Sequence, residues 1–407
     1  MKFGGSSVAD AEKIKNVARR IAAARESGDD VVVVLSARGK TTDGLVADAA
    51  EITATPSLRE MDMLLSTGER VSCALMAMAL ADLGHRAISF TGSQAGILTD
   101  GAHTKAKILE IRGDRIRDAL ARDHIVLVAG FQGVSPANDV TTLGRGGSDT
   151  TAVALAAALD ADVCEIYTDV TGVFSADPRV EPTAVKLPLV SHEEMLEAAS
   201  AGSKVLALRS VEFARNHNVP VHVRSSLVPD EGTWITEETP DMEQAIVTAI
   251  AHRSDEAKIT LTHVADKAGV AAAIFTALAD ALVNVDMIIQ NVSIEGHTDV
   301  SFTVPLAEAK RAESVITGLR DELGYAEMAT NDQIGSVALV GAGMKSEPGV
   351  AAKMFRVLAA EGINIQMIDT STIRITVVID RREVERAVRA LHDAFDLSNE
   401  AERRANV

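Results

Sequence analysis

Hydrophobic residues in the first half of the chain form short runs that alternate with helical stripes. The runs at residues 31–35 and 125–129 are far shorter than the roughly 20 residues of a membrane-spanning helix, so they predict buried strands. The stripe that follows residue 10 recurs at helical spacing and consists of Ile14, Val17, Ala18 and Ile21. Such alternation of strands and helices is typical of an α/β protein.

A second pattern is a duplication near the C-terminal end. Residues 269–288 placed over residues 349–368, a shift of 80 without gaps, are identical at ten of the 20 positions. One matched pair is Asn284 with Asn364. This agreement marks a true internal repeat.

Each copy of the repeat predicts a similar order of elements. Strands are expected at 258–264, 285–292 and 298–304 in the first copy and at 336–340, 363–368 and 373–379 in the second. A helix follows each glycine turn, and its apolar face in the first copy consists of Ile274, Phe275, Leu278 and Leu282. The second copy closes with a helix at 382–395. The order strand, helix, strand, strand, helix, strand is ferredoxin-like.

The length of the chain predicts more than one domain. At 407 residues it exceeds what one hydrophobic core usually serves. Because 47% of the residues are hydrophobic and 24% are charged, without low-complexity tracts, the chain is expected to fold apart from its termini. We expect three domains, at residues 1–240, 241–335 and 336–407.

Charge and composition exclude some classes of partner. A net charge of −18 and only 3% aromatic residues disfavour nucleic acid, although a few local cations can still hold a nucleotide. The N-terminal residues lack the apolar core of a secretory signal and no apolar run suits a membrane, so we expect a cytoplasmic protein. Cys73 and Cys164 lie in apolar stretches and are expected to be buried free thiols.

A glycine-rich segment at the start of the chain offers a phosphate site. Gly4 and Gly5 precede a predicted helix, and glycines there let backbone amides approach an anion without a side-chain clash. Lys2 would supply a positive charge. Taken alone this signal is weak, because paired glycines more often form a plain turn and the spacing is neither a Walker motif nor GxGxxG.

A second glycine-rich segment spans residues 141–151 and also precedes an apolar helix, expected at 152–159. Arg145 offers a planar fork for a carboxylate, and Asp149 can hold an ammonium group or position a lysine. The alternative is a solvated turn capped by Asp149. That alternative fits less well because two such segments each adjoin a predicted strand.

Polar residues also follow the predicted strand that ends at residue 35. Ser36 comes directly after it and Thr42 a few residues later, where open α/β sheets bind ligands. Farther along lie Glu69 and the segment 167–179, which contains Asp169. Acidic residues in loops are usually just solvated, so neither carries a function alone.

Taken together, these segments resemble the aspartate kinase family of the amino-acid kinase superfamily over essentially the whole chain. The matching motifs are residues 2–8, Ser36, 69–70, Phe131, 144–151, 168–179 and 202–204, and the repeats resemble ACT domains at 266–269 and 346–349. The resemblance implies an α/β amino-acid kinase fold of three layers with a mainly parallel sheet, followed by two ferredoxin-like ACT domains.

The implied reaction is ATP-dependent phosphorylation of the side-chain carboxylate of L-aspartate to 4-phospho-L-aspartate, the first step toward lysine, threonine and methionine. The aspartate side chain has a reference pKa of about 3.9, so it is already ionised and needs no general base. Lys2 with Mg²⁺ would neutralise phosphate charge, and Asp149 would orient the lysine. No residue of the chain is assigned as a metal ligand.

The resemblance also implies three sets of binding residues. The aspartate set is Ser36, Thr42, Glu69, Arg145, Ser148 and Asp149. The ATP set is Lys2, Gly4, Gly5, Ser6, Thr168, Asp169, Asp177, Arg179 and Lys204. The effector set is Asp266, Gly269, Ala271, Asn284, Gln290, Ser293, Asn364, Ile365 and Ser371.

Lysine and threonine are the expected feedback inhibitors, bound where ACT modules pair edge to edge, which implies a homo-oligomer. A short regulatory subunit starting near Met242 is a further hypothesis, because some members of the family begin one there. The chain departs from the family pattern in three places. Only one residue precedes Lys2, where the family carries several apolar strand residues. Ala268 replaces the proline that usually precedes Gly269, and Asp369 stands where related chains carry a small hydroxyl residue.

Two other functions stay open from the sequence. A kinase of another acid or of a nucleotide could use the same glycine-rich segments. A non-catalytic sensor could keep the repeats without turnover. Joint retention of Lys2, Glu69, Arg145 and Asp149 favours the aspartate kinase interpretation over both.

Overall fold

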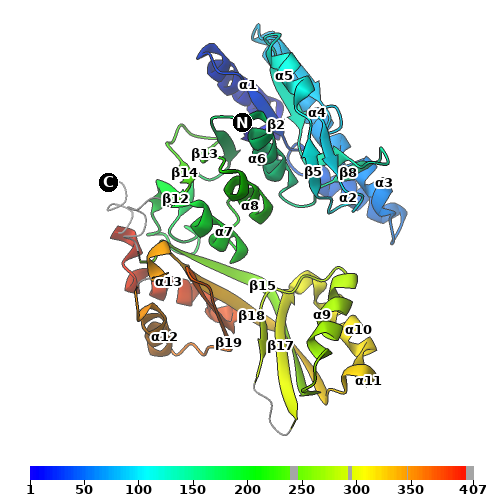
Figure 1. Cartoon of the computed structure of the whole chain (residues 1–407). Coiled ribbons are helices and arrows are strands. Elements are labelled where there is room, and N and C mark those ends of the chain that lie inside the picture. Colours follow the sequence, from blue (N-terminus) through cyan, green and yellow to red (C-terminus); the bar gives the residue numbers. More distant parts are fainter. Residues whose placement is uncertain (239–245, 292–295, 346, 400–407) are drawn as a thin grey trace.

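The computed structural model describes residues 1–238, 246–291, 296–345 and 347–399 (Figure 1). Its N-terminal part is built on an eight-stranded sheet of order β12-β14-β13-β9-β1-β2-β6-β3. Neighbouring strands are parallel except β13 and β14, so β1 lies between two parallel neighbours. The strands are β1 (Lys2–Phe3), β2 (Val32–Leu35), β3 (Ala87–Phe90), β6 (Ile125–Ala129), β9 (Cys164–Thr168), β12 (Leu189–Ser191), β13 (Val221–Ser225) and β14 (Thr233–Thr236).

Helices cover both faces of this sheet, which makes three layers. Helices α1 and α4 pack on one face against Phe3 and Leu127, and α5 to α8 pack on the other against Val34 and Val128. The predicted three-layer, mainly parallel α/β fold is therefore confirmed. The bounds are α1 (Ala11–Glu26), α4 (Thr67–Asp82), α5 (Asp114–Leu120), α6 (Gly147–Leu159), α7 (His192–Ser200) and α8 (Leu208–His217).

Two smaller sheets and two further helices surround this core. The first sheet has the order β5-β4-β7-β8 and the second pairs β10 with β11. The bounds are α2 (Thr41–Ile52), α3 (Leu58–Leu65), β4 (Ile97–Thr99), β5 (Ile108–Ile111), β7 (Gln132–Val134), β8 (Val140–Thr142), β10 (Val173–Phe174) and β11 (Lys186–Leu187). Both Cys73 and Cys164 are buried free thiols, as predicted.

One helical stretch, Leu58–Asp82, is long and apolar enough to cross a membrane by length and composition alone. It comprises α3 and α4 and contains two buried carboxylates, Asp62 and Glu69. On one side α4 contributes to the core beneath the main sheet. These features are those of a core helix in a globular protein.

The C-terminal part is one six-stranded sheet of order β16-β17-β15-β18-β20-β19, in the lower half of Figure 1. Its long strands β15 (Ala249–Ala265) and β18 (Glu327–Val340) run antiparallel through both repeats. The other strands are β16 (Ile288–Gln290), β17 (His297–Pro305), β19 (Met367–Thr370) and β20 (Arg374–Asp380). The covering helices are α9 (Val270–Asp280), α10 (Ala309–Gly318), α11 (Arg320–Leu323), α12 (Val350–Ala360) and α13 (Val384–Ala394).

The second module takes one strand segment from upstream of the first repeat. Residues 256–262 of β15 pair with β17 and with the first half of β18, which completes the first ferredoxin-like module. Residues 249–253 of β15 instead pair with residues 336–340 of β18. The second copy closes with helix α13, and its fourth strand comes from upstream of the first copy. The predicted domain limits stay a prediction.

Within the first repeat the predicted apolar face is correct except at one position. Ile274 and Leu278 are fully buried and Phe275 packs against the same core. The prediction for Leu282 is wrong, because α9 ends at Asp280 and Leu282 is exposed with φ +56.

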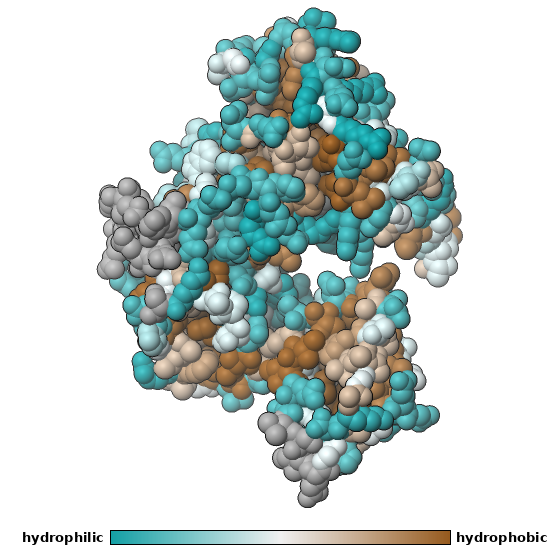
Figure 2. Space-filling view, viewed as in Figure 1, coloured by the Kyte–Doolittle hydropathy of each residue, from teal (hydrophilic) through white to brown (hydrophobic). Residues whose placement is uncertain are grey.

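Figure 2 shows apolar surface gathered over the C-terminal sheet.

Removing a buried side chain from α12 should destabilise the shared sheet. Leu358 is fully buried in the core of the second module, so we expect Leu358→Ala to lower the free energy of unfolding by about 2–5 kcal/mol. Arg356→Ala on the exposed side of α12 is the control and should change it by less than about 0.5 kcal/mol. Urea unfolding followed by circular dichroism measures both; equal effects would contradict the assigned core.

Candidate active site

The candidate active site lies at the carboxyl edge of the main sheet. Strands β9, β1, β2 and β6 are neighbours and parallel, so the segments that follow them meet at one edge. These segments are residues 4–6 after β1, Ser36 after β2, Gly130 and Phe131 after β6, and Asp169 after β9. Four predicted motifs that are far apart in the sequence therefore converge.

Lys2 and Asp149 form an ion pair at this edge. Lys2 Nζ lies 2.5 Å from Asp149 Oδ1, and the two side chains are only 10% and 14% exposed. Asp149 belongs to the first turn of α6, which starts at Gly147 and not at the predicted residue 152. A Cβ atom on Gly4 would lie 3.6 Å from Lys2 Nζ, so the glycine backbone passes beside the ammonium group.

Several glycines allow the chain to pack closely here. A Cβ on Gly5 would lie 2.6 Å from the Ala37 carbonyl oxygen, and one on Gly130 would lie 2.8 Å from Ser148 Oγ. Either contact is too short for a real side chain. The result is a shielded ammonium beside backbone that carries no side chain, which fits a nucleotide phosphate.

Glu69 is buried, and only one of its two carboxylate oxygens accepts a hydrogen bond among the described residues. It stands in the first turn of α4 and is 3% exposed. Its Oε1 accepts a hydrogen bond from the Ala37 amide at 3.2 Å, whereas Oε2 has no partner among the described residues. Burial raises the pKa of Glu69 to about 7, against the opposing effect of backbone hydrogen bonds and Arg70. Such a carboxylate is suited to receive a cation.

Arg145 lies in the turn between β8 and α6 and is exposed. Within the described part of the chain it forms no ion pair, so its guanidinium is free for a ligand. Nearby, Ser148 is buried at the start of α6, while Ser36 and Thr42 are half-buried. The predicted aspartate residues thus stand directly after β2, in α2, in α4, in the turn before α6 and in the first turn of α6.

A residue that sequence reasoning missed holds this turn in place. Arg209 of α8 donates to the Leu143 carbonyl at 2.8 Å and to the Ala106 carbonyl at 3.1 Å. Gly146 has φ +71, and a Cβ there would lie 2.2 Å from Ala207 Cβ. These contacts join segments distant in sequence, so no local spacing could have revealed them.

Phe131 adopts a left-handed backbone conformation with φ +69 directly after β6. Its amide donates to Thr151 Oγ1 at 3.1 Å and its carbonyl accepts from the Leu143 amide at 2.8 Å. A bulky residue in this region is strained, and the strain persists only where neighbours fix it. The backbone hydrogen bonds of Phe131 therefore hold the end of β6 beside the turn that carries Arg145.

The predicted ATP residues divide into two groups. Thr168 and Asp169 stand at the end of β9 and share a hydrogen bond of 3.1 Å. Asp177 pairs with Arg179 at 2.7 Å, which holds the pKa of the Asp177 carboxyl below its usual range. Lys204, like Arg179, is exposed. The second group consists of Asp177, Arg179 and Lys204. These residues come later in the chain than β9, in the segments that approach the C-terminal sheet.

The predicted effector residues lie in turns and at the ends of edge strands. Gly269 has φ +101 and ends the turn before α9, and Ser371 donates to Glu197 Oε1 of α7 at 2.6 Å. Ser293 lies outside the described residues, as does Met242. The others are Asp266 in the same turn, Ala271 in α9, Asn284 before β16, Gln290 in β16, and Asn364 and Ile365 before β19. Strands β16 and β19 are the two edges of the C-terminal sheet.

Two arginines of the C-terminal sheet donate hydrogen bonds to Ser200 at the end of α7. Arg253 of β15 donates to the Ser200 carbonyl and pairs with Asp286 at 2.7 Å. Arg374 of β20 donates to Ser200 Oγ at 2.7 Å and pairs with Asp369 at 2.6 Å. Ser200 is four positions before Lys204, so two strands of the second module contact the segment that leads to a predicted ATP-set residue, and Asp286 of the first module holds one of these arginines.

Comparison with known proteins agrees with this architecture. Residues 1–225 match the amino acid kinase family, and residues 262–318 and 337–395 match an ACT domain. The chain is therefore an amino acid kinase with C-terminal ACT domains. Aspartokinase from Mycolicibacterium smegmatis is 55% identical over 406 residues, which cover 98% of this chain and 96% of that protein.

Solved structures give the same result. Escherichia coli aspartokinase III in complex with aspartate and ADP (R-state) matches with a TM-score of 0.83 and 27% identity, covering 97% of this chain and 98% of that one. The complex of the same enzyme with lysine and aspartate (T-state) matches with a TM-score of 0.73 and 26% identity over the same shares. The chain belongs to the aspartokinase family.

The buried Glu69 should make folding stability depend on pH. The unfolded chain loses this proton near pH 4.5 and the folded protein only near pH 7, so the native state binds more protons between those values. Stability should therefore fall as pH rises through this window, by about 3 kcal/mol. We expect Glu69→Gln to remove that fall, measured by urea unfolding at pH 5 and pH 8.

The exposed Glu51 of α2 provides the matched control. Glu51→Gln should keep the pH dependence of the wild type. If Glu69→Gln loses as much stability between the two pH values as the wild type does, the assigned burial of the Glu69 charge is wrong.

Proposed function

We propose that this enzyme transfers the γ-phosphoryl group of ATP to the side-chain carboxylate of L-aspartate and forms 4-phospho-L-aspartate. The observation that carries the proposal is the Lys2–Asp149 ion pair at 2.5 Å, with the buried Glu69 and with Arg145, which has no ion-pair partner among the described residues, in nearby segments. The E. coli relative, 27% identical, binds aspartate and ADP. That complex supports the choice of both substrates.

The aspartate end of the site needs three complementary charges. Arg145 is proposed to pair with the α-carboxylate through its planar fork, and Glu69 to receive the α-ammonium. Ser36, Thr42 and Ser148 would donate hydrogen bonds. An ammonium group beside Glu69 also compensates a buried carboxylate whose pKa is raised to about 7.

The ATP end is proposed to use backbone and cations. Lys2, beside the backbone of residues 4–6, would hold phosphate oxygens, and Asp149 would keep its ammonium aimed there. ATP would bring Mg²⁺, which neutralises charge on the phosphates. Thr168, Asp169, Asp177, Arg179 and Lys204 would line the remainder of the nucleotide site.

Catalysis would rest on position and electrostatics. The aspartate side chain has a reference pKa of about 3.9, so it attacks as a carboxylate without a base. Holding it in line with the phosphoryl group removes much of the entropic barrier. Consistent with this, the proposal assigns no histidine to the reaction.

Lysine and threonine are proposed as feedback inhibitors of this first step toward lysine, threonine and methionine. Edge strands β16 and β19 leave backbone groups available for a second chain, and Ile288 and Ile368 on them are exposed. This supports a homo-oligomer formed through the ACT domains. The two arginines on Ser200 offer a route from effector turns to the ATP side.

The decisive experiment is ATP turnover with L-aspartate, with the acyl phosphate trapped as the hydroxamate. We expect aspartate-dependent product, little product with L-glutamate, and suppression by lysine plus threonine. Turnover with a different acid would replace aspartate as substrate. Binding of the effectors without any turnover would favour a sensor.

Arg145 gives a prediction for substrate affinity. Loss of a charge-assisted pair should lower kcat/KM for aspartate by about tenfold to a hundredfold in Arg145→Ala, since such a bond contributes about 1.5–3 kcal/mol. KM for ATP should stay near that of the wild type. Arg145→Lys should recover only part, because lysine cannot form the bidentate pair.

Steady-state kinetics at varied aspartate and fixed ATP measure this effect, with Arg356→Ala on the distant α12 as control. An unchanged KM for aspartate in Arg145→Ala would remove this residue from the aspartate set.

A further inference from the structure

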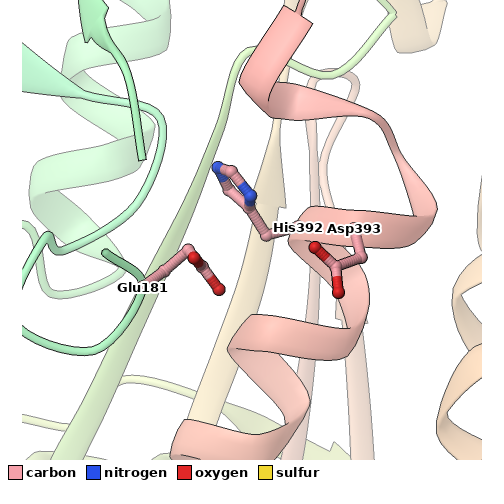
Figure 3. Close-up of side chains that lie close together, drawn as sticks. All are labelled: Glu181, His392 and Asp393. Atoms are coloured by element: carbon pink, nitrogen blue, oxygen red, sulfur yellow. The ribbon is translucent and has the colours of Figure 1, made fainter. Parts of the chain in front are cut away.

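Outside the candidate active site, three potential metal ligands meet where the kinase domain contacts the second ACT module. Glu181 follows the segment that carries Asp177 and Arg179, and His392 and Asp393 are adjacent residues of α13. One ligand atom from each lies within 4.8 Å of the others. Figure 3 shows the carboxylates of Glu181 and Asp393 on either side of the His392 side chain.

The imidazole of His392 is buried, and only one of its two ring nitrogens has a hydrogen-bond partner among the described residues. It has no exposed surface, and its Nε2 lies 2.9 Å from Ser175 Oγ. Its Nδ1 is buried without a hydrogen-bond partner among the described residues. If Nε2–H donates to Ser175, Nδ1 presents a bare lone pair, which is the arrangement found in metal-binding histidines.

Ser175 is suited to this supporting role. Its Oγ already accepts a hydrogen bond from the Val185 amide at 3.0 Å, so its position is fixed by the backbone.

The two carboxylates form no ion pair with a lysine or arginine among the described residues. Glu181 is 5% exposed, and its Oε1 accepts from the Thr183 amide at 2.8 Å and the Thr183 hydroxyl at 2.6 Å. Arg389 of α13 acts on Glu181 only through its charge, because its guanidinium donates to the Val180 carbonyl and to Glu385. Within the part of the chain that the structure describes, neither Glu181 nor Asp393 has an ion-pair partner.

We propose that Glu181, His392 and Asp393 form a binding site for a divalent transition-metal cation, with Zn²⁺ as the best fit. Imidazole nitrogen favours Zn²⁺ over Mg²⁺, and three protein ligands plus water complete a tetrahedral site. At Zn–ligand distances of about 2.0–2.2 Å the donors must draw closer than they now lie. Asp393 is exposed at the end of its helix and can make that adjustment.

The site would join two parts of the molecule. Glu181 belongs to the kinase domain, two residues after Arg179, whereas His392 and Asp393 belong to the second ACT module. A bound ion would therefore fix α13 against the segment that carries two residues of the ATP set. It is separate from the Mg²⁺ that ATP would bring, because none of its ligands belongs to the ATP set.

The test uses the full chain, freed of metal with a chelator and studied without nucleotide or Mg²⁺. Zn²⁺ binding is measured by calorimetry and native mass spectrometry, and Co²⁺ is added as a spectroscopic substitute. We expect one Zn²⁺ per chain and a tetrahedral Co²⁺ absorption band. Glu181→Gln with Asp393→Asn should weaken binding at least about tenfold.

Glu385→Gln, on the same helix but outside the site, is the matched control and should bind Zn²⁺ as the wild type does. His392→Gln should abolish the Co²⁺ band; because this residue is buried, the double carboxamide variant remains the deciding test if it does not fold. Absence of stoichiometric Zn²⁺ binding would overturn the proposal. So would equal binding by the double variant and the wild type.

Discussion

The pairing of Lys2 with Asp149 constrains the rest of the kinase domain. A lysine shielded from solvent in the middle of a sheet requires an acid close by, and a helix on the opposite layer must begin where that acid is needed. Helix α6 therefore starts at Gly147, close to the strand end. The close approach at Gly130 and the left-handed Phe131 both serve to bring β6 and α6 together at this point.

The C-terminal half obeys a different constraint, which is the continuity of two long strands. Because β15 and β18 run through both ACT modules, neither module can shift without bending a strand of the other. Arg253 and Arg374 connect this sheet to Ser200, at the end of α7. The acids that hold these arginines, Asp286 and Asp369, lie in the segments that carry the predicted effector residues. Contacts therefore run without a break from the predicted effector turns to Ser200, four positions before Lys204.

Local sequence signals predicted much of this molecule. The run at 125–129 is β6 with the same bounds, and the stripe from Ile14 to Ile21 is the buried face of α1. The start of α6 was missed because Ser148 and Asp149 have low helix propensity, although both are favourable in a first turn. The first glycine-rich segment lies at the carboxyl edge because it follows β1, whereas the second follows β8 of a smaller sheet and its approach to this edge depends on tertiary contacts.

What the sequence could not supply was pairing between distant segments. The repeat itself is evident from identical residues, but nothing in it says that residues 249–253 complete the second copy. Leu282 matched the helical period and still lies outside the helix, since spacing alone does not mark an end. Arg209, and the burial of Glu69 with one oxygen unpaired, likewise depend on tertiary contacts.

Glu69 shows how the unliganded site is organised for a charged substrate. A carboxylate that is 3% exposed and has one oxygen without a partner destabilises the folded protein when it ionises. Replacing it with an apolar residue would relieve that penalty and would also remove the attraction for an ammonium group. Since the same low-dielectric surroundings strengthen both effects, the low stability of ionised Glu69 and the proposed preference for an amino acid over a plain dicarboxylic acid would have one physical origin.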